Sequence, residues 1–465
     1  MKAKDYLTAA LLPAAAKIRE ELRAEVTQNS LTVLSGHLGR LVLGLISSAL
    51  LARGLGPEGL SVFSVVGAAM AIAITVADVG LGNSAVRQIA GSLAPARQRA
   101  REAAVAYTRL KLLSSLLAAG LIVALAHPIA RILNLPQDSG PTLIWIAALS
   151  LLAMALSGMM GTILRALRRF GAMVATQLTN AALTVALIAG LFFAGRLTVL
   201  PALLVGAITA AAAAGLGLLL LPREWRTAIV SQTGLQRDAS RPLLAFSKWL
   251  WISAILSILS VQLDLLLLNR WSEPRIVGYY ALALSLAFKA DIINQTLHTV
   301  LLPSVSALST QAEYIAYIRG SLSRSAVLGL ALVLALPLAR PFIVAVYGSA
   351  FAPSVNVFYF LMAVVLVDLL TIPILLLAFP LNMPRLIAGS GGVGLAILVG
   401  TALLLIPSWG MYGAVAAKLA GKVGGAMVLG LAILMRLRQS NGITADGAQP
   451  LDADSPPDRP PPDPT

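Results

Sequence analysis

Residues 30–83 read SLTVLSGHLGRLVLGLISSALLARGLGPEGLSVFSVVGAAMAIAITVADVGLGN, and this stretch decides the fold. Two apolar segments of about 20 residues flank a short turn, ARGLGPEG, at residues 52–59. A helix rises about 1.5 Å per residue and the hydrocarbon core of a bilayer is about 30 Å thick, so each segment is long enough to cross it. Segments of the same kind continue to Met435. The sequence therefore predicts an all-α, polytopic membrane protein.

The composition supports the same conclusion. Of the 465 residues, 58% are hydrophobic and 12% are charged, and the mean hydropathy is +0.84. Soluble domains carry about 25% charged residues, so a soluble globular protein is excluded. The chain has no cysteine and three histidines, so we expect no disulfide and no metal site, and no motif indicates another cofactor.

The apolar pattern predicts twelve spans. They cover residues 31–53, 60–83, 104–126, 142–164, 173–195, 199–221, 246–269, 277–303, 322–341, 355–380, 386–406 and 412–435. Two of them are unusual, because span eight carries Lys289, Asp291 and His298 and span ten carries Pro373. Each of these two is either a full crossing or a re-entrant or broken helix.

Lysine and arginine are concentrated on one side of the predicted membrane, which the positive-inside rule makes the cytoplasmic side. We therefore expect both termini in the cytoplasm. Because much of the net charge of +15 follows from topology, we expect no nucleic-acid partner. We expect residues 1–29 to form a helix at the cytoplasmic surface and residues 437–465, rich in Pro and Asp, to be a disordered tail.

Two similar strings indicate that the chain is duplicated. Residues 52–66 read ARGLGPEGLSVFSVV and residues 269–284 read NRWSEPRIVGYYALAL. In each, a basic residue, a Pro and Glu pair and a glycine precede an apolar helix. Six spans on either side of the longest connection, residues 222–245, predict an N-lobe (residues 30–221) and a C-lobe (residues 246–436) with the same orientation. Such a parallel repeat places a substrate site between the lobes near mid-membrane.

At these strings the chain resembles the polysaccharide flippases of the MOP (multidrug/oligosaccharidyl-lipid/polysaccharide) superfamily. The strings that carry the resemblance are ARGLGPEG (52–59), ADVGLGNSAVRQIA (77–90), VGYYALAL (277–284), LLPSVSAL (301–308) and LLIPSWGMYGAVAAKLAGK (404–422). The resemblance implies an exporter of lipid-linked oligosaccharides in the inner (plasma) membrane of a bacterium, with two six-helix lobes and alternating access. It also implies as partners a polyprenyl diphosphate carrier, membrane lipid, a coupling H⁺ or Na⁺ and a polysaccharide polymerase.

Ionisable residues inside a membrane cost about 2.5–3.5 kcal/mol each to insert, so each needs a reason. In span one, His37 and Arg40 lie on one stripe of polar and small residues. The planar fork of Arg40 suits a diphosphate; alternatively, a carboxylate such as Asp78 satisfies it from across the bundle. Gln177 and Asn180, on one face of span five, are candidates for contacts with sugar.

Further charged residues lie in the C-lobe spans. Lys289 is a candidate for holding an anion; alternatively, Lys289 and Asp291 take part in intramembrane ion pairing with partners on different helices, or belong to a coupling site. Lys418 and Lys422 lie one turn apart, so an anion between them would relieve their repulsion; alternatively, they snorkel to lipid headgroups. The remaining carboxylates serve either ion coupling or structure: Asp78, Asp264 and Asp368.

The leading functional hypothesis is a flippase that moves an undecaprenyl-diphosphate-linked oligosaccharide to the outer leaflet, for O-antigen or exopolysaccharide export. Because sugar and diphosphate cannot cross hydrocarbon, a polar, cationic cavity would have to enclose them. A polymerase or ligase acting on the same lipid would need acids, bases or a metal on substantial outer loops, and the outer loops are short. A multidrug exporter of the same superfamily would need an acidic, aromatic cavity, whereas the spans carry at least as many bases as acids. The sequence therefore favours transport over catalysis.

Overall fold

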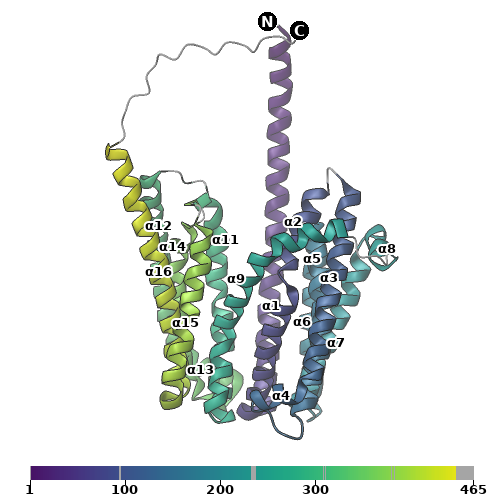
Figure 1. Ribbon diagram of the computed structural model, residues 1–465, viewed down its shortest axis with the longest axis vertical. Coiled ribbons are helices and arrows are strands. Elements are labelled where there is room, and N and C mark those ends of the chain that lie inside the picture. The colour runs from purple at the N-terminus through teal and green to yellow at the C-terminus, as the bar shows by residue number, and fades with distance from the viewer. Residues whose placement is uncertain are drawn as a thin grey trace.

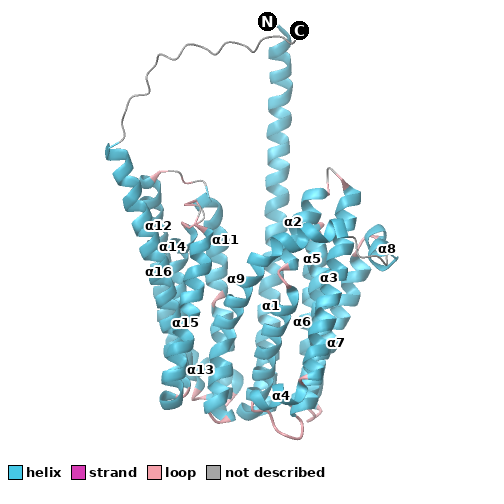
Figure 2. Cartoon of the chain, viewed as in Figure 1, coloured by secondary structure: helices cyan, strands magenta, loops and turns pink. Residues whose placement is uncertain are grey.

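The computed structural model describes residues 2–93, 96–231, 237–306, 308, 310–378, 380–381 and 383–446. These residues form helices with short connections and no strand (Figure 2). The first eight helices are α1 (Lys2–Asp78), α2 (Leu81–Ser92), α3 (Arg97–Ala124), α4 (Ala126–Ile132), α5 (Gly140–Ala166), α6 (Phe170–Phe193), α7 (Val199–Leu220) and α8 (Arg223–Ser231). The others are α9 (Arg237–Trp271), α10 (Pro274–Ala290), α11 (Ile292–Ser306), α12 (Gln311–Ala335), α13 (Ala339–Tyr347), α14 (Ser354–Leu376), α15 (Pro384–Trp409) and α16 (Met411–Asp446).

Eleven helical stretches of the described chain are long and apolar enough to cross a membrane. The first, Thr32–Asp78, has 47 residues, about twice what one crossing requires. It turns at Gly56, whose φ of 66° is readily adopted only by glycine. The predicted spans 31–53 and 60–83 correspond to the two arms of α1, and with this division the eleven stretches correspond to the twelve predicted spans. The chain is an all-α, multi-pass membrane protein.

Some predicted boundaries shift. Span two ends at Asp78, because Val79 and Gly80 adopt positive φ angles of 50° and 67° and a new helix, α2, follows. In span eight, Asp291 separates α10 from α11, although the stretch Pro274–His298 as a whole is long and apolar enough to cross. In span ten, α14 continues through Pro373.

The helices form two groups, coloured purple to teal and green to yellow, that meet at the end of the molecule near α4 and α13 and diverge at the other (Figure 1). We call the meeting end, where α1 turns, the Gly56 end. Hydrophobic clusters explain this arrangement. Toward the Gly56 end, single clusters contain residues of both lobes, such as Val65, Leu143, Leu268 and Tyr280. Away from it the lobes have separate cores, represented by Leu81, Tyr107 and Trp225 and by Leu301, Tyr314 and Ile433.

Helix α9 passes from one lobe to the other. Near its start, Leu243 packs into the N-lobe core and its carbonyl accepts a 3.0 Å hydrogen bond from Ser84 of α2. The indole of Trp251 donates to the carbonyl of Val76, at 3.0 Å. Further along, Leu265 joins the cluster shared by both lobes. The expected linker, residues 222–245, thus contains α8 and the first turns of α9.

The chain ends differ from expectation in two respects. Helix α1 extends from Lys2 straight beyond the bundle, whereas we expected residues 1–29 to form a separate helix lying at the cytoplasmic surface of the membrane (Figure 1). Helix α16 continues to Asp446, so the first residues of the expected disordered tail are helical. The rest of that tail, residues 447–465, lies outside the described residues.

Candidate functional site

Lys418 of α16 is buried against oxygen atoms of α9. Its Nζ donates to Oδ2 of Asp264 at 2.7 Å and to the carbonyl oxygen of Val261 at 3.0 Å. The hydroxyl of Tyr280, on α10, donates to the same carboxylate oxygen. Because Lys418 is 4% exposed and Asp264 0%, water solvates neither charge. One buried ion pair therefore joins three helices, and it balances the charge of Lys418 without a bound anion.

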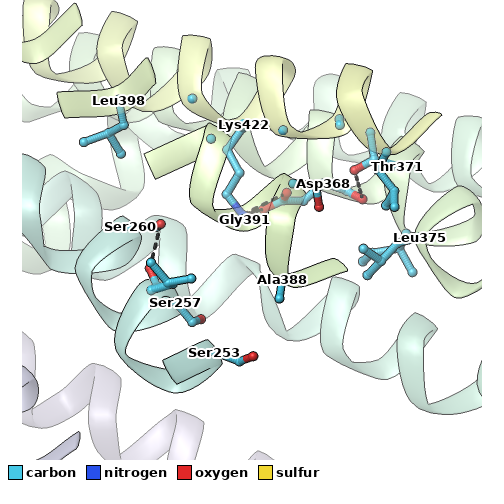
Figure 3. A pocket seen from close by; sticks show the side chains of 18 of the residues that line it. Ser253, Ser257, Ser260, Asp368, Thr371, Leu375, Ala388, Gly391, Leu398 and Lys422 are labelled. Atoms are coloured by element: carbon cyan, nitrogen blue, oxygen red, sulfur yellow. Dashed lines mark hydrogen bonds and ion pairs between the residues drawn. The ribbon is translucent and has the colours of Figure 1, made fainter. Parts of the chain in front are cut away.

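Lys422, one turn further along α16, faces a cavity of about 360 Å³ between α9, α14, α15 and α16 (Figure 3). We call this cavity the C-lobe pocket. The Nζ of Lys422 donates to both carboxylate oxygens of Asp368, at 3.0 and 2.7 Å. The pair remains accessible from the pocket, with side-chain exposures of 40% for Lys422 and 25% for Asp368. Each of the two lysines predicted to share an anion thus has a carboxylate of its own, and their role in substrate binding remains a prediction.

Hydroxyl groups from α9 form another wall of the C-lobe pocket. Ser253, Ser257 and Ser260 recur at helical spacing and face it together (Figure 3). Ser260 donates to the carbonyl oxygen of Leu256 at 2.8 Å. The hydroxyls of Ser253 and Ser257 make no hydrogen bond within the described part of the chain, so they are available to a ligand.

Glycines form part of the wall that α15 and α16 contribute, beside side chains such as Leu398 and Lys422. A Cβ on Gly394 would lie 2.8 Å from the carbonyl oxygen of Gly421, and one on Gly421 would lie 2.6 Å from that of Gly394. The two backbones therefore touch, which only residues without a side chain permit. Gly391, which also lines the pocket, has open space where a Cβ would lie.

Lys289 of α10 faces a second cavity, of about 390 Å³, between α1, α10 and the α12–α14 region. Most of its lining is apolar, including Leu41 and Leu45 of α1. The Nζ of Lys289 has one contact, a long 3.4 Å hydrogen bond to the carbonyl oxygen of Ser285 in its own helix. No carboxylate of the described residues pairs with it.

Among the described residues, neither Lys289 nor Asp291 forms an ion pair, and a role in coupling remains a prediction. Oδ1 of Asp291 instead accepts a hydrogen bond from Nδ2 of Asn294, at 2.8 Å. Asn294 also donates to the carbonyl oxygen of Val365 on α14, at 3.1 Å. Asp291 thus helps to hold the break between α10 and α11 against α14.

Arg40 of α1 is exposed in the isolated chain, and its Nη1 donates to Oε1 of Gln177 on α6 at 2.8 Å. The structure thus brings together two residues that the sequence singled out separately. His37, one turn away, is also exposed. Asn180 is partly buried, and its carbonyl oxygen accepts a 2.8 Å hydrogen bond from Thr184.

Asp78 does not pair with Arg40, which was the alternative reading of that arginine. It forms an ion pair with Lys111 of α3, whose side chain is 6% exposed. Sequence reasoning missed Lys111, although a lysine within the apolar third span was a visible signal. The pair fastens the end of α1 to α3, which favours a structural role for Asp78.

At the Gly56 end, polar contacts tie the lobes together. Arg53 of α1 donates from Nε to the carbonyl oxygen of Val346, at 2.8 Å, and from Nη2 to that of Ala345. Asn269 donates to the carbonyl oxygen of Leu133 at 2.6 Å, and Asn134 donates to that of Asn269 at 3.0 Å.

The two duplicated strings also meet at this end. A Cβ on Gly278 would overlap the carbonyl oxygen of Pro57, so the backbones of the strings are in direct contact. In this structure the lobes are therefore joined at the Gly56 end.

Comparisons with known proteins agree with this architecture. The model of the family described as "Polysaccharide biosynthesis protein" matches residues 26–309. No sequence among curated proteins matches the chain.

Solved structures share the fold at low sequence identity. The lipid II flippase MurJ, in an inward closed conformation, has 11% identity and a TM-score of 0.71, covering 91% of this chain and 94% of its own. An inward-facing multidrug resistance MATE transporter of the MOP superfamily has 13% identity and a TM-score of 0.69, covering 89% and 99%. A MOP superfamily transporter from Pyrococcus furiosus has 16% identity and a TM-score of 0.56, covering 90% and 96%.

The family match covers more than half of the chain, and the TM-scores of about 0.7 over about nine-tenths of it show that the fold is shared with these transporters. The chain therefore belongs to the polysaccharide biosynthesis protein family and has the MOP-superfamily transporter fold.

Proposed function

We propose that this protein is a flippase that moves a polyprenyl-diphosphate-linked oligosaccharide across the inner membrane by alternating access, and that it catalyses no covalent reaction. The carrier is an undecaprenyl diphosphate, and the oligosaccharide is a unit for O-antigen or exopolysaccharide export. The family match to polysaccharide biosynthesis and the fold shared with a lipid II flippase support this choice.

The observation that carries the proposal is a pair of cations without carboxylate partners, one from each lobe. Arg40 and Lys289 have neutral hydrogen-bond partners only, within the described chain. Both lie well inside their spans, since Arg40 is about 12 Å along the axis from Thr32, and Lys289 is about 22 Å from Pro274. Leu41, next to Arg40, lines the same cavity as Lys289. A cation facing lipid at this depth would be costly, so we place both at the boundary between the lobes.

A diphosphate bound there would have its negative charge balanced by the two cations and would accept hydrogen bonds from both. Arg40 offers a planar, bidentate donor and Lys289 a compact point charge. Gln177 holds the guanidinium in place without cancelling its charge. Because Arg40 and Lys289 belong to different lobes, an anion bound between them would also couple headgroup binding to the relative position of the lobes. The isoprenoid tail would remain in the lipid.

Orientation and energy supply are parts of the same proposal. We place the Gly56 end on the outer side and both termini in the cytoplasm, so that the lobes diverge toward the leaflet where the substrate is made. Asp264 and Asp368 already balance lysines, which makes Asp291 the better candidate among these carboxylates for coupling to H⁺ or Na⁺. The membrane potential acting on the anionic headgroup is the alternative energy source. A polymerase that consumes the exported unit is the expected protein partner.

A reconstitution experiment tests the proposal. Vesicles containing the purified chain are loaded with a polyprenyl diphosphate oligosaccharide whose sugar carries a fluorescent label, and a membrane-impermeant quencher reports which leaflet holds the label. We expect movement between leaflets that depends on the protein and is lost in Arg40→Ala. Movement of an organic dye cation but not of the labelled lipid would favour the multidrug exporter that other members of the fold represent. Chemical change of the sugar would favour an enzyme.

A further inference from the structure

The C-lobe pocket has a mostly apolar lining that carries several polar groups, and its charges balance. Its lining contains Asp368, Lys418 and Lys422, and the carboxylate of Asp264 lies 2.7 Å from Lys418. Two ammonium groups thus face two carboxylates. An anion entering the pocket would have to compete with Asp368 for Lys422, and a cation would have to compete with Lys422 for Asp368. The pocket therefore selects neither a phosphate nor an organic cation by charge.

The polar groups of the pocket suit a ligand that both donates and accepts hydrogen bonds. Lys422 has three N–H donors, and the bonds to Asp368 leave one available; the Asp368 oxygens retain acceptor capacity. Across the pocket, the hydroxyls of Ser253 and Ser257 make no hydrogen bond within the described chain, and each can donate or accept one. Sugar hydroxyls match such an alternation of donors and acceptors.

The size and surface of the pocket suit a sugar ring. A volume of about 360 Å³ lies within the range of small-molecule sites. In the wall formed by α15 and α16, Gly391, Gly394 and Gly421 add no side chain to the pocket, which leaves room for a ring. Leu375 and Leu398 offer apolar surface for the ring faces.

The pocket is also close to the boundary between the lobes. Lys418, which lines it, has its Nζ 5.9 Å from the centre of the Phe288 ring. The next residue, Lys289, lines the second cavity. A residue that lines the C-lobe pocket thus contacts α10, the helix that carries Lys289 into the second cavity, so a headgroup with its diphosphate at Lys289 has a nearby site for its sugar.

We propose that the C-lobe pocket binds an uncharged, hydroxyl-rich sugar ring of the transported headgroup, separately from the diphosphate. This inference rests on the proposed flippase function. It reverses the expectation that Lys418 and Lys422 hold the anion, because both are balanced by carboxylates of the chain.

Two test lipids distinguish the sugar site from the diphosphate site. One is a polyprenyl diphosphate without sugar, and the other carries a neutral disaccharide; binding of each to the full-length chain in lipid nanodiscs is measured by titration. We expect the glycosylated lipid to bind about tenfold more tightly, as two or three net hydrogen bonds would provide. A third lipid, with a uronic acid in place of the outer neutral sugar, should lose that gain.

Gly391→Leu fills the pocket without a backbone clash, because open space lies where the Cβ would point. Leucine is also a better helix former than glycine, so the substitution should not destabilise the helical conformation of α15. We expect this variant to bind the glycosylated lipid no more tightly than wild type binds the bare one. Gly400→Leu is the matched control: it lies on the same helix, also has open space, and lies outside the pocket lining.

A milder variant, Ser253→Ala with Ser257→Ala, removes only the two hydroxyls and should lower the preference severalfold. Equal affinity of wild type for the bare and neutral glycosylated lipids would overturn the sugar site alone, as would a preference that survives in Gly391→Leu. If wild type binds neither lipid, the flippase assignment fails and the sugar site fails with it.

Discussion

Lys418 and Asp264 carry opposite charges inside the C-lobe, where neither is solvated by water. The attraction between them offsets a desolvation cost of several kcal/mol per ion, and removal of one partner leaves that cost uncompensated. We therefore expect Lys418→Met to destabilise the protein by about 3–5 kcal/mol. Thermal unfolding in detergent, followed by the loss of monodisperse protein, measures the change.

The double variant Lys418→Met with Asp264→Leu serves as the control for that measurement. It removes both charges, so it should recover most of the lost stability. Glu224→Gln provides a second comparison, with an ion pair outside the core. Glu224 pairs with Arg97 and Arg101, and all three side chains are accessible to water. Loss of such pairs lowers the free energy of unfolding by about 1 kcal/mol or less. If the single Lys418→Met variant were as stable as wild type, the ion pair would make no contribution to the stability of the fold.

Arg40 is the residue on which substrate recognition depends in our account. Replacing it by alanine removes charge-assisted hydrogen bonds worth about 1.5–3 kcal/mol, so transport should fall by about 10–100-fold. Gln177→Ala, which loses only the 2.8 Å hydrogen bond that orients the guanidinium, should cause a smaller loss.

Arg340→Ala is the matched control for Arg40→Ala. Arg340 is an exposed arginine on α13 and lies outside both cavities. Labelled-lipid movement in vesicles is the measurement for all three variants. Wild-type rates in Arg40→Ala would remove this residue from the anion site.

Among the helices, the contact between the duplicated strings is the tightest constraint. A side chain on Gly278 would overlap the carbonyl oxygen of Pro57, so Gly278→Ala forces the two strings apart. We expect a loss of about 1–3 kcal/mol, as is usual for overpacking. Gly206→Ala on α7, which has open space around the added carbon, should leave the thermal midpoint near that of wild type. Equal midpoints for the two variants would contradict the close contact.

The helices themselves could be predicted because bilayer thickness fixes the length of an apolar segment. Spans such as 142–164 and 199–221 fall within α5 and nearly coincide with α7 for that reason. The break in span eight was also foreseeable, since Lys289 and Asp291 interrupt its apolar run. The turn at Gly56 follows from the GLGPEG string, in which glycine permits a positive φ.

The partners of the intramembrane charges could not be predicted in the same way. Lys418 and Asp264 are 154 residues apart, and Lys111 and Asp78 come from helices that a single sequence does not place side by side. Which helices touch depends on packing of the whole bundle, for which apolar periodicity gives no register. The sequence therefore identified most of the charged residues in the spans but not which of them are neutralised within the chain.

At the scale of the whole molecule, the contacts at the Gly56 end predict a measurable conformation. The chain has no cysteine, so Asn134→Cys with Asn269→Cys introduces a single reporter pair across the lobes. We expect this pair to cross-link readily in the protein without substrate, and less during transport, when the Gly56 end must open.

A pair within one lobe controls for the chemistry of cross-linking. Thr184 and Thr209, whose hydroxyls are 3.1 Å apart between α6 and α7, should cross-link equally in both conditions after replacement by cysteine. Cross-linking of the inter-lobe pair that stays constant during transport would argue against opening at this end.

The central claim is that the protein carries completed lipid-linked oligosaccharides across the membrane, and depletion in the source cell tests it most directly. The protein is depleted, and the lipid-linked oligosaccharides are assigned to a leaflet by their accessibility to an impermeant sugar-modifying reagent. Our account predicts that completed units accumulate on the cytoplasmic leaflet. Completed units that reach the outer leaflet at the normal rate would contradict it.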